Sequence, residues 1–113
     1  MEKLPLETLV QAFVDLALEE QDAIFWARYK EYNRLYDIVV GVVKELSLRP
    51  GDGRTLLLPL LDHASVQVRM NAAFELWDIA RDEARAALEL IDKRNEMPQA
   101  ADARGWLWRR QGH

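Results

Sequence analysis

The sequence contains no cysteine, only five glycines and four prolines, and no long uninterrupted apolar run. Without cysteine there is no disulfide framework, no thiolate nucleophile and no sulfur ligand for a metal ion. Half of the residues are hydrophobic, and glycine and proline are few. This composition is atypical of disordered, collagen-like or low-complexity chains. The longest apolar stretch, residues 56–61, includes a proline and is far shorter than the roughly 18 residues that span a bilayer. We therefore expect a folded chain with no membrane span.

Length and charge narrow the class of protein further. The 113 residues indicate a single domain over residues 1–113. Fifteen basic against 19 acidic side chains give a net charge of -4, which opposes the phosphate attraction that nucleic-acid binding requires. The first residues, Met-Glu-Lys-Leu-Pro, lack the charged region and apolar stretch of a secretory signal. We expect a cytoplasmic protein and disfavour a nucleic-acid partner.

Apolar residues recur at three- and four-residue steps, the spacing of helices with one buried face. Helices are predicted from residue 6 to the acidic segment 19–22, then over about 24–48, 54–62, 66–80 and 83–93, and from about residue 98 onward. The acidic segment, with Glu19, Glu20 and Asp22, is expected to be a solvated helix end. Pro59 should bend or shorten the third helix, and Ser65 should cap the fourth. No strand-like alternation competes with this pattern, so the predicted fold class is all-α.

Residues 56–76 form the most informative stretch. Leucines fill its first helix, Asp62 lies at the turn, and the second helix opens with Val68-Arg69 and then Ala72-Ala73. This order resembles one HEAT-like repeat. A shift of 31 positions superposes a degenerate second copy, pairing Leu57 with Leu88, Leu60 with Ile91, Ala72 with Ala103, Leu76 with Leu107 and Trp77 with Trp108. The resemblance implies a right-handed α-solenoid of about six helices, built from HEAT-like or armadillo-like hairpins.

A wider pattern points to a narrower family. It combines Tyr-Asn-Arg-Leu-Tyr at 32–36, Leu-Leu-Pro-Leu-Leu-Asp-His at 57–63 and Pro-Gln-Ala-Ala-Asp-Ala at 98–103. Together these resemble the short bacterial HEAT-like domains of the domain of unknown function 2019 type, over nearly the whole chain. That family has no assigned reaction, and HEAT-like repeats serve as surfaces for partners. The resemblance implies a non-enzymatic protein-protein interaction module; the alternative is a HEAT-like protein that binds nucleic acid or processes its bases.

Four residues are the candidates for binding a protein partner: Trp26, Tyr29, Asn33 and Tyr36. Their three- and four-residue spacing predicts that they share one face of the long second helix. Tyrosine and tryptophan offer a large contact area with a polar tip, and both are enriched among the residues that dominate interface energetics. The alternative is that a long helix packed on two sides needs a wide apolar surface, which would make these side chains core.

Two further assignments concern structure and self-association. Arg69, at the start of the second helix of the hairpin, is expected to satisfy the turn, with Asp62 as its acidic partner. Trp106 and Trp108 are two positions apart on the last helix and project to different sides, so we expect one of them to be exposed or at an interface. Such a tryptophan could cap the last repeat or form a homodimer contact.

The chain offers no convincing catalytic residue. Asp62, His63 and Ser65 name the members of a hydrolytic triad, yet neighbours in one tight turn rarely converge as a triad requires. We expect a helix cap and a turn residue instead. His63 and His113 lack the spacing of paired metal ligands, and the turn at residues 51–54 lacks the lysine of a phosphate loop. No catalytic residue, metal site or cofactor is predicted.

Overall fold

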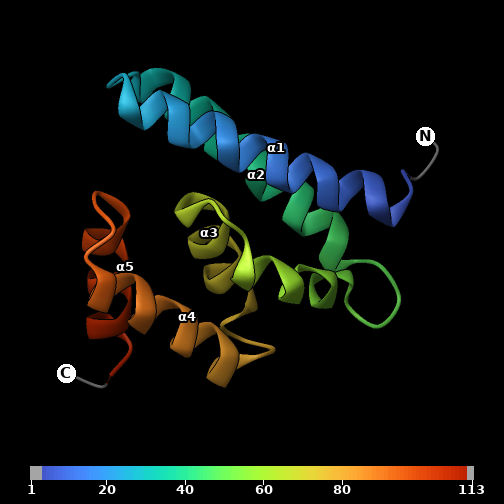
Figure 1. Cartoon of the computed structure of the whole chain (residues 1–113). Coiled ribbons are helices and arrows are strands. Elements are labelled where there is room, and N and C mark those ends of the chain that lie inside the picture. The colour runs from blue at the N-terminus through green and yellow to red at the C-terminus, as the bar shows by residue number, and fades with distance from the viewer. Residues whose placement is uncertain (1–3, 112–113) are drawn as a thin grey trace. The chain divides into compact units, whose positions relative to one another are not determined.

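The computed structural model describes residues 4–111, and within that range it contains helices and no strand (Figure 1). The elements are α1 (Leu6–Phe25), α2 (Tyr29–Ser47), the 3-10 helix η1 (Gly53–Asp62), α3 (Val66–Leu76), α4 (Arg81–Arg94) and α5 (Gln99–Arg109). The predicted all-α class and the count of about six helices are confirmed. Among the described helices, none combines the length and the apolar composition that a bilayer-crossing segment requires.

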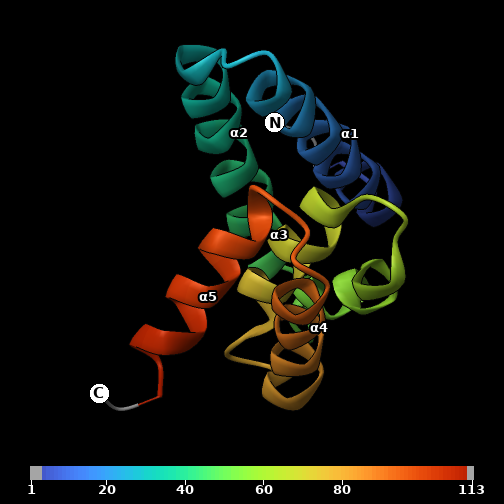
Figure 2. The same cartoon turned by 60° about the vertical axis from the view of Figure 1, so that its left-hand side comes forward.

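The chain divides into two compact units, Met1–Leu56 and Leu57–His113. In the first unit, α1 and α2 pack against each other and form an antiparallel pair, which we call the first hairpin (Figures 1 and 2). One face of each helix supplies the core, because apolar side chains recur at helical spacing along both. The buried apolar residues of the pair are Leu9, Phe13, Ala17, Ala23, Leu35, Val39, Val43 and Leu46.

In the second unit, α4 packs against both α3 and α5 (Figure 2). The buried apolar residues here are Leu57, Val68, Met70, Ala72, Ala73, Leu76, Trp77, Ala84, Leu88, Ile91, Ala100, Ala103 and Leu107. A buried amide pair lies among them, in which Gln99 Nε2 donates to Gln67 Oε1 at 3.1 Å. The single domain over residues 1–113 and the solenoid arrangement stay predictions.

The first predicted helix boundary is wrong. Helix α1 continues through the acidic segment to Phe25, because glutamate and glutamine favour a helix and do not end one. Glu19 and Asp22 are exposed, as expected of a solvated segment, but Glu20 is only 1% exposed and the segment lies within the helix and not at its end. The chain turns instead at residues 26–28, and α2 begins at Tyr29. Its observed end at Ser47 agrees with the predicted end near Leu48.

The remaining boundaries agree in outline. The segment around Pro59 is helical but has 3-10 geometry over Gly53–Asp62, consistent with the expected short or distorted helix. Helix α3 ends at Leu76, earlier than predicted. Ser65 is its N-cap, as predicted, and Ser65 Oγ accepts a hydrogen bond from Val68 N at 3.3 Å. Asn95 ends α4 in the left-handed conformation that often follows a helix.

Candidate functional site

The connection between α1 and α2, residues 25–29, forms the tip of the first hairpin. Arg28 N donates to Ala23 O at 2.8 Å and Ala27 N donates to Ile24 O at 3.0 Å, which closes the end of α1. Ala27 has a φ of 56°, in the left-handed region that a residue with a Cβ rarely adopts. This reversal lets α2 begin immediately at Tyr29.

The hairpin tip exposes three large aromatic side chains. Phe25 is 77% exposed, Trp26 is 60% exposed and Tyr29 is 67% exposed. The rings of Phe25 and Trp26 meet edge to face with their centroids 5.0 Å apart. These side chains are therefore presented to solvent and are not part of the core of the first hairpin.

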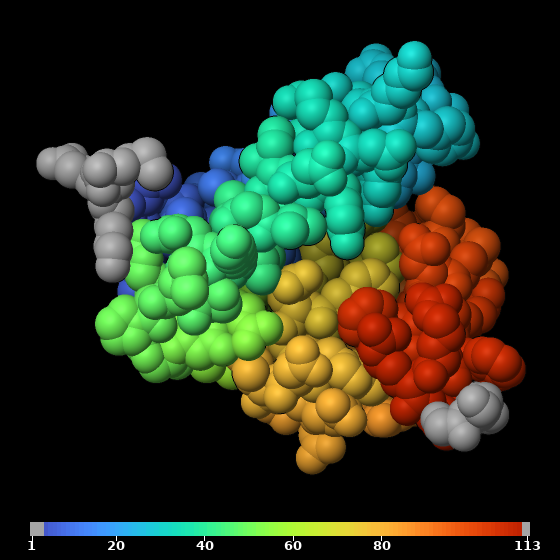
Figure 3. Space-filling model, turned by 180° about the vertical axis from the view of Figure 1, so that it is seen from behind, coloured from blue at the N-terminus to red at the C-terminus, as the bar shows by residue number. Residues whose placement is uncertain are grey.

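The predicted binding residues do not share one helix. Trp26 is the C-cap of α1, whereas Tyr29, Asn33 and Tyr36 belong to α2, so the prediction of one helical face is wrong for Trp26. The predicted alternative, in which these side chains form the core, is also wrong, because Asn33 is exposed and Tyr36 is 53% exposed. Figure 3 shows the cyan and green residues of α2 at the surface.

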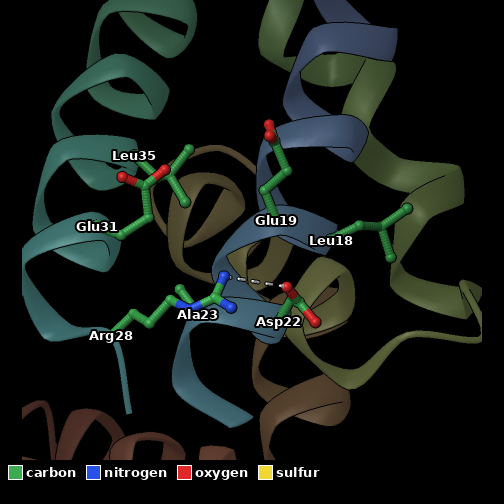
Figure 4. A pocket seen from close by; sticks show the side chains of 7 residues that line it. All are labelled: Leu18, Glu19, Asp22, Ala23, Arg28, Glu31 and Leu35. Carbon is green, nitrogen blue, oxygen red and sulfur yellow. Dashed lines mark ion pairs between the residues drawn. The ribbon is translucent and has the colours of Figure 1, made fainter. Parts of the chain in front are cut away.

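A pocket of about 370 Å³ lies between α1 and α2 beside the hairpin tip (Figure 4). It is lined by Leu18, Glu19, Asp22, Ala23, Arg28, Glu31 and Leu35. Ala23 and Leu35 are each only 2% exposed and provide its apolar base. The charged side chains come from both helices and from the connection between them, so the pocket exists only because the hairpin closes.

Three carboxylates and one guanidinium line this pocket. Arg28 Nη1 lies 4.0 Å from Asp22 Oδ2, and both side chains are more than 60% exposed, so this ion pair is weak. Glu31 accepts a hydrogen bond from Arg34 Nη2 at 2.5 Å. That bond holds the pKa of the Glu31 carboxyl below its ordinary value, and Arg34 and Arg28 add to the effect through their charge. Glu31 therefore stays ionised at neutral pH.

The predicted pairing of Asp62 with Arg69 is wrong. Arg69 forms its ion pair with Glu96, through a fork in which Nη1 and Nη2 each donate to one carboxylate oxygen at 2.8 Å. Arg69 also donates from Nε to His63 O at 2.8 Å, so it does satisfy the turn as expected. The acidic partner differs because the connection between α4 and α5 brings Glu96 to the guanidinium.

The turn residues show no catalytic arrangement. Ser65 N donates to His63 Nδ1 at 2.9 Å, and Ser65 Oγ caps α3. These bonds serve the turn and cap roles that we expected. No group of three or more His, Asp or Glu side chains within residues 4–111 is arranged to hold a metal ion. His113, the other histidine considered as a ligand, lies outside the described residues.

The two C-terminal tryptophans differ in exposure, as predicted. Trp106 stacks on Phe74 with ring centroids 4.2 Å apart, and the Arg110 guanidinium lies 3.3 Å from the centre of its ring. Trp108 is 62% exposed. A homodimer contact through either residue stays a prediction, with Trp108 the more accessible of the two.

The family model described as "Domain of unknown function (DUF2019)" matches residues 7–109. The chain belongs to this family. A DUF2019 assignment agrees with the resemblance noted in the sequence. The chain is also similar to a solved structure titled "Crystal Structure of the Protein RPA1889 from Rhodopseudomonas palustris CGA009". The two are 34% identical with a TM-score of 0.90, over 93% of this chain and 87% of the other. No curated protein matches the chain.

Within this DUF2019 domain, sequence reasoning missed the pocket. Glu19 and Asp22 were predicted to be part of a solvated helix end, and no role was predicted for Arg28. The sequence did not reveal the position of the turn. The predicted break at residues 19–22 would have separated the carboxylates of Glu19 and Asp22 from α2. Placing the turn at residues 26–28 brings Asp22 and Glu31 to the same side of the hairpin.

Proposed function

We propose that the protein is a non-enzymatic protein-protein interaction module that acts in the cytoplasm and has a right-handed, HEAT-like solenoid fold. The observation that supports this function is the exposure of Phe25, Trp26 and Tyr29 at the hairpin tip. Adjacent exposed aromatic side chains are typical of interaction sites, whereas single exposed apolar residues are ordinary.

The energetics of association favour the exposed aromatic residues of the hairpin tip as contacts for a partner. Burying one large apolar side chain against a partner is worth about 1.5–3 kcal/mol. Aromatic residues lose little conformational entropy on binding, because they have two side-chain torsions. Tyrosine and tryptophan also keep a polar atom available for a hydrogen bond across an interface. The tip therefore combines the residue types that dominate measured interfaces.

The test begins with affinity capture of partners from source cells by the tagged protein, followed by purification of a captured partner. Isothermal titration calorimetry then compares the wild type with the Trp26→Ala/Tyr29→Ala variant. We expect the tip variant to bind the partner at least about 30-fold more weakly, which corresponds to the loss of one interface hot spot.

The control for this test is Leu48→Ala, because Leu48 is 68% exposed and lies at the other end of α2. It should leave affinity unchanged, and circular dichroism should show that all variants keep the helical content of the wild type. Equal affinity of the tip variant and the wild type would contradict a role for the hairpin tip.

A further inference from the structure

We infer that the pocket between α1 and α2 receives an arginine or lysine side chain from a basic segment of the protein partner. This inference rests on the proposed function, and it specifies the chemistry of the partner. Four observations carry it: the size of the pocket, its apolar base, the surplus of carboxylates around it, and the aromatic residues at the adjacent hairpin tip.

The shape of the pocket fits a long side chain with a polar end. Its volume of about 370 Å³ is at the lower end of the range for pockets that bind small groups. The buried methyl groups of Ala23 and Leu35 offer a surface for an aliphatic stem. Lysine and arginine bury such a stem on apolar surface while their charged ends stay in polar surroundings.

The charge of the pocket favours a cation. Glu19, Asp22 and Glu31 line it against one lining guanidinium, that of Arg28, and Arg34 beside the pocket pairs with Glu31. One carboxylate charge therefore remains in surplus. Arg28 lies 4.0 Å from Asp22, which is longer than a charge-assisted hydrogen bond. Figure 4 shows these two side chains near each other at the mouth, with Glu19 and Glu31 on the facing helices. An incoming guanidinium could therefore bond to Asp22 without breaking a strong internal ion pair.

The hairpin tip supports the same partner. Trp26 and Tyr29 adjoin the pocket residues in sequence and expose their rings. Aromatic faces attract cations, with tryptophan the strongest, so a second basic residue of the same segment could stack there. The net charge of -4 on the whole chain adds a long-range attraction for a basic segment.

The first experiment uses N-acetyl-L-arginine N-methylamide as the probe and its neutral isostere, N-acetyl-L-citrulline N-methylamide, as the control. Amide chemical shifts of the isotope-labelled protein are followed during titration to about 50 mM of each compound. We expect saturable shifts at residues 18–35 with the arginine compound, binding at least about 10-fold weaker with citrulline, and weaker binding at higher salt. Equal shifts with both compounds, or no shifts at these residues, would overturn the inference.

Charge-matched variants then identify the carboxylates. Glu19→Gln/Asp22→Asn removes two lining charges, and Asp15→Asn/Asp37→Asn removes two charges from the same helices outside the pocket. The first variant should lose the arginine shifts, and the second should keep them. Loss in both variants would mean that overall charge attracts the probe, which would overturn a specific pocket. Thermal melting checks that both variants remain folded.

The purified partner separates failure of this inference from failure of the proposed function. A partner that binds the pocket variant normally but loses affinity for the Trp26→Ala/Tyr29→Ala variant would keep the interaction module and overturn the role of the pocket. A partner that is insensitive to the tip variant would keep the interaction module and contradict the role of the hairpin tip, whatever the arginine probe shows. Failure to capture any protein partner would contradict the proposed function. Loss of affinity in both variants, but not in Asp15→Asn/Asp37→Asn, would support both.

Discussion

Ala27 has a left-handed backbone with a φ of 56° at the hairpin tip. This conformation costs a residue with a Cβ about 1–2 kcal/mol, and glycine avoids the cost. Glycine also has a larger entropy in the unfolded chain, which offsets part of the gain. We predict that Ala27→Gly raises the free energy of unfolding by about 1 kcal/mol, as measured by urea denaturation. Ala86→Gly, at an exposed position in the interior of α4, is the matched control and should lower it by about 1 kcal/mol.

The ion pair between Arg69 and Glu96 should make the stability of the protein depend on pH. The hydrogen bond from Arg69 lowers the pKa of the Glu96 carboxyl from its ordinary value of 4.5. A group whose pKa is lower in the folded state contributes stability above the unfolded value, and this contribution disappears as the pH falls through the folded value. The wild type should therefore lose more stability between about pH 7 and pH 3 than Glu96→Gln does, as measured by urea unfolding at each pH.

At neutral pH, substituting Arg69 should lower the free energy of unfolding more than substituting Glu96 does. Glu96→Gln should lower the free energy of unfolding by about 1 kcal/mol, and Arg69→Met by about 2 kcal/mol. The larger cost follows because Arg69 also donates to His63 O at the turn. Additive effects in the double variant would contradict a direct pair, since contacting residues couple. The sequence could predict the role of Arg69 at its turn, but Glu96 is 27 residues away and is brought there by tertiary structure.

At the scale of elements, Gly41 offers a clean test of helix stability. It is exposed within α2, and a Cβ built on it would meet nothing within 4 Å. We predict that Gly41→Ala raises the free energy of unfolding by about 1 kcal/mol, because alanine has the higher helix propensity. Gly105→Ala is the comparison, since its Cβ would lie 3.1 Å from Arg109 Nη1 and some of the gain would be lost. A Gly41→Ala variant no more stable than the wild type would contradict this account.

Helical spacing and caps were sufficient to predict most elements. Ser65 and the turn after Ser47 lie where the sequence places them, because caps and turn residues act locally. The end of α1 was not predictable in this way. Glu20 is polar yet buried, and Ala27 is a good helix former that nevertheless adopts a left-handed conformation. Both depend on tertiary structure, which single-sequence periodicity does not report.

At the scale of the whole molecule, the sequence was sufficient for the fold class and the family but not for the candidate site. The family resemblance rested on three short segments spread along the chain, and the family model matches residues 7–109. The site depends instead on two helices closing around one pocket. Likewise, residue spacing alone could not show whether Trp26 and Tyr36 are exposed or packed in the core.

The last prediction concerns nucleic-acid binding, the alternative function, and it follows from the net charge of the chain. The chain carries a net charge of -4, so phosphate attraction must come from a local basic surface. In the second unit Arg69 is paired with Glu96 and Arg104 with Asp92, which offsets their charge. Arg81 and Arg85 lie over the Trp77 ring and keep their charge, so they form a small cationic cluster on α4. We predict no retardation of a 30-base-pair DNA duplex or a 30-nucleotide RNA at about 0.1 M salt in gel-shift assays.

The outcome that would contradict this prediction is a retarded band whose affinity falls steeply as salt rises, because counterion release accompanies phosphate contacts. The variant Arg81→Gln/Arg85→Gln would then test the location. Loss of the band in that variant would place the contact on α4, and the Trp26→Ala/Tyr29→Ala variant should keep it. A band lost only in the tip variant would instead indicate bases stacking on the exposed aromatic rings, as in single-strand binding proteins. The hairpin tip would then be a nucleic-acid surface rather than a protein-binding one.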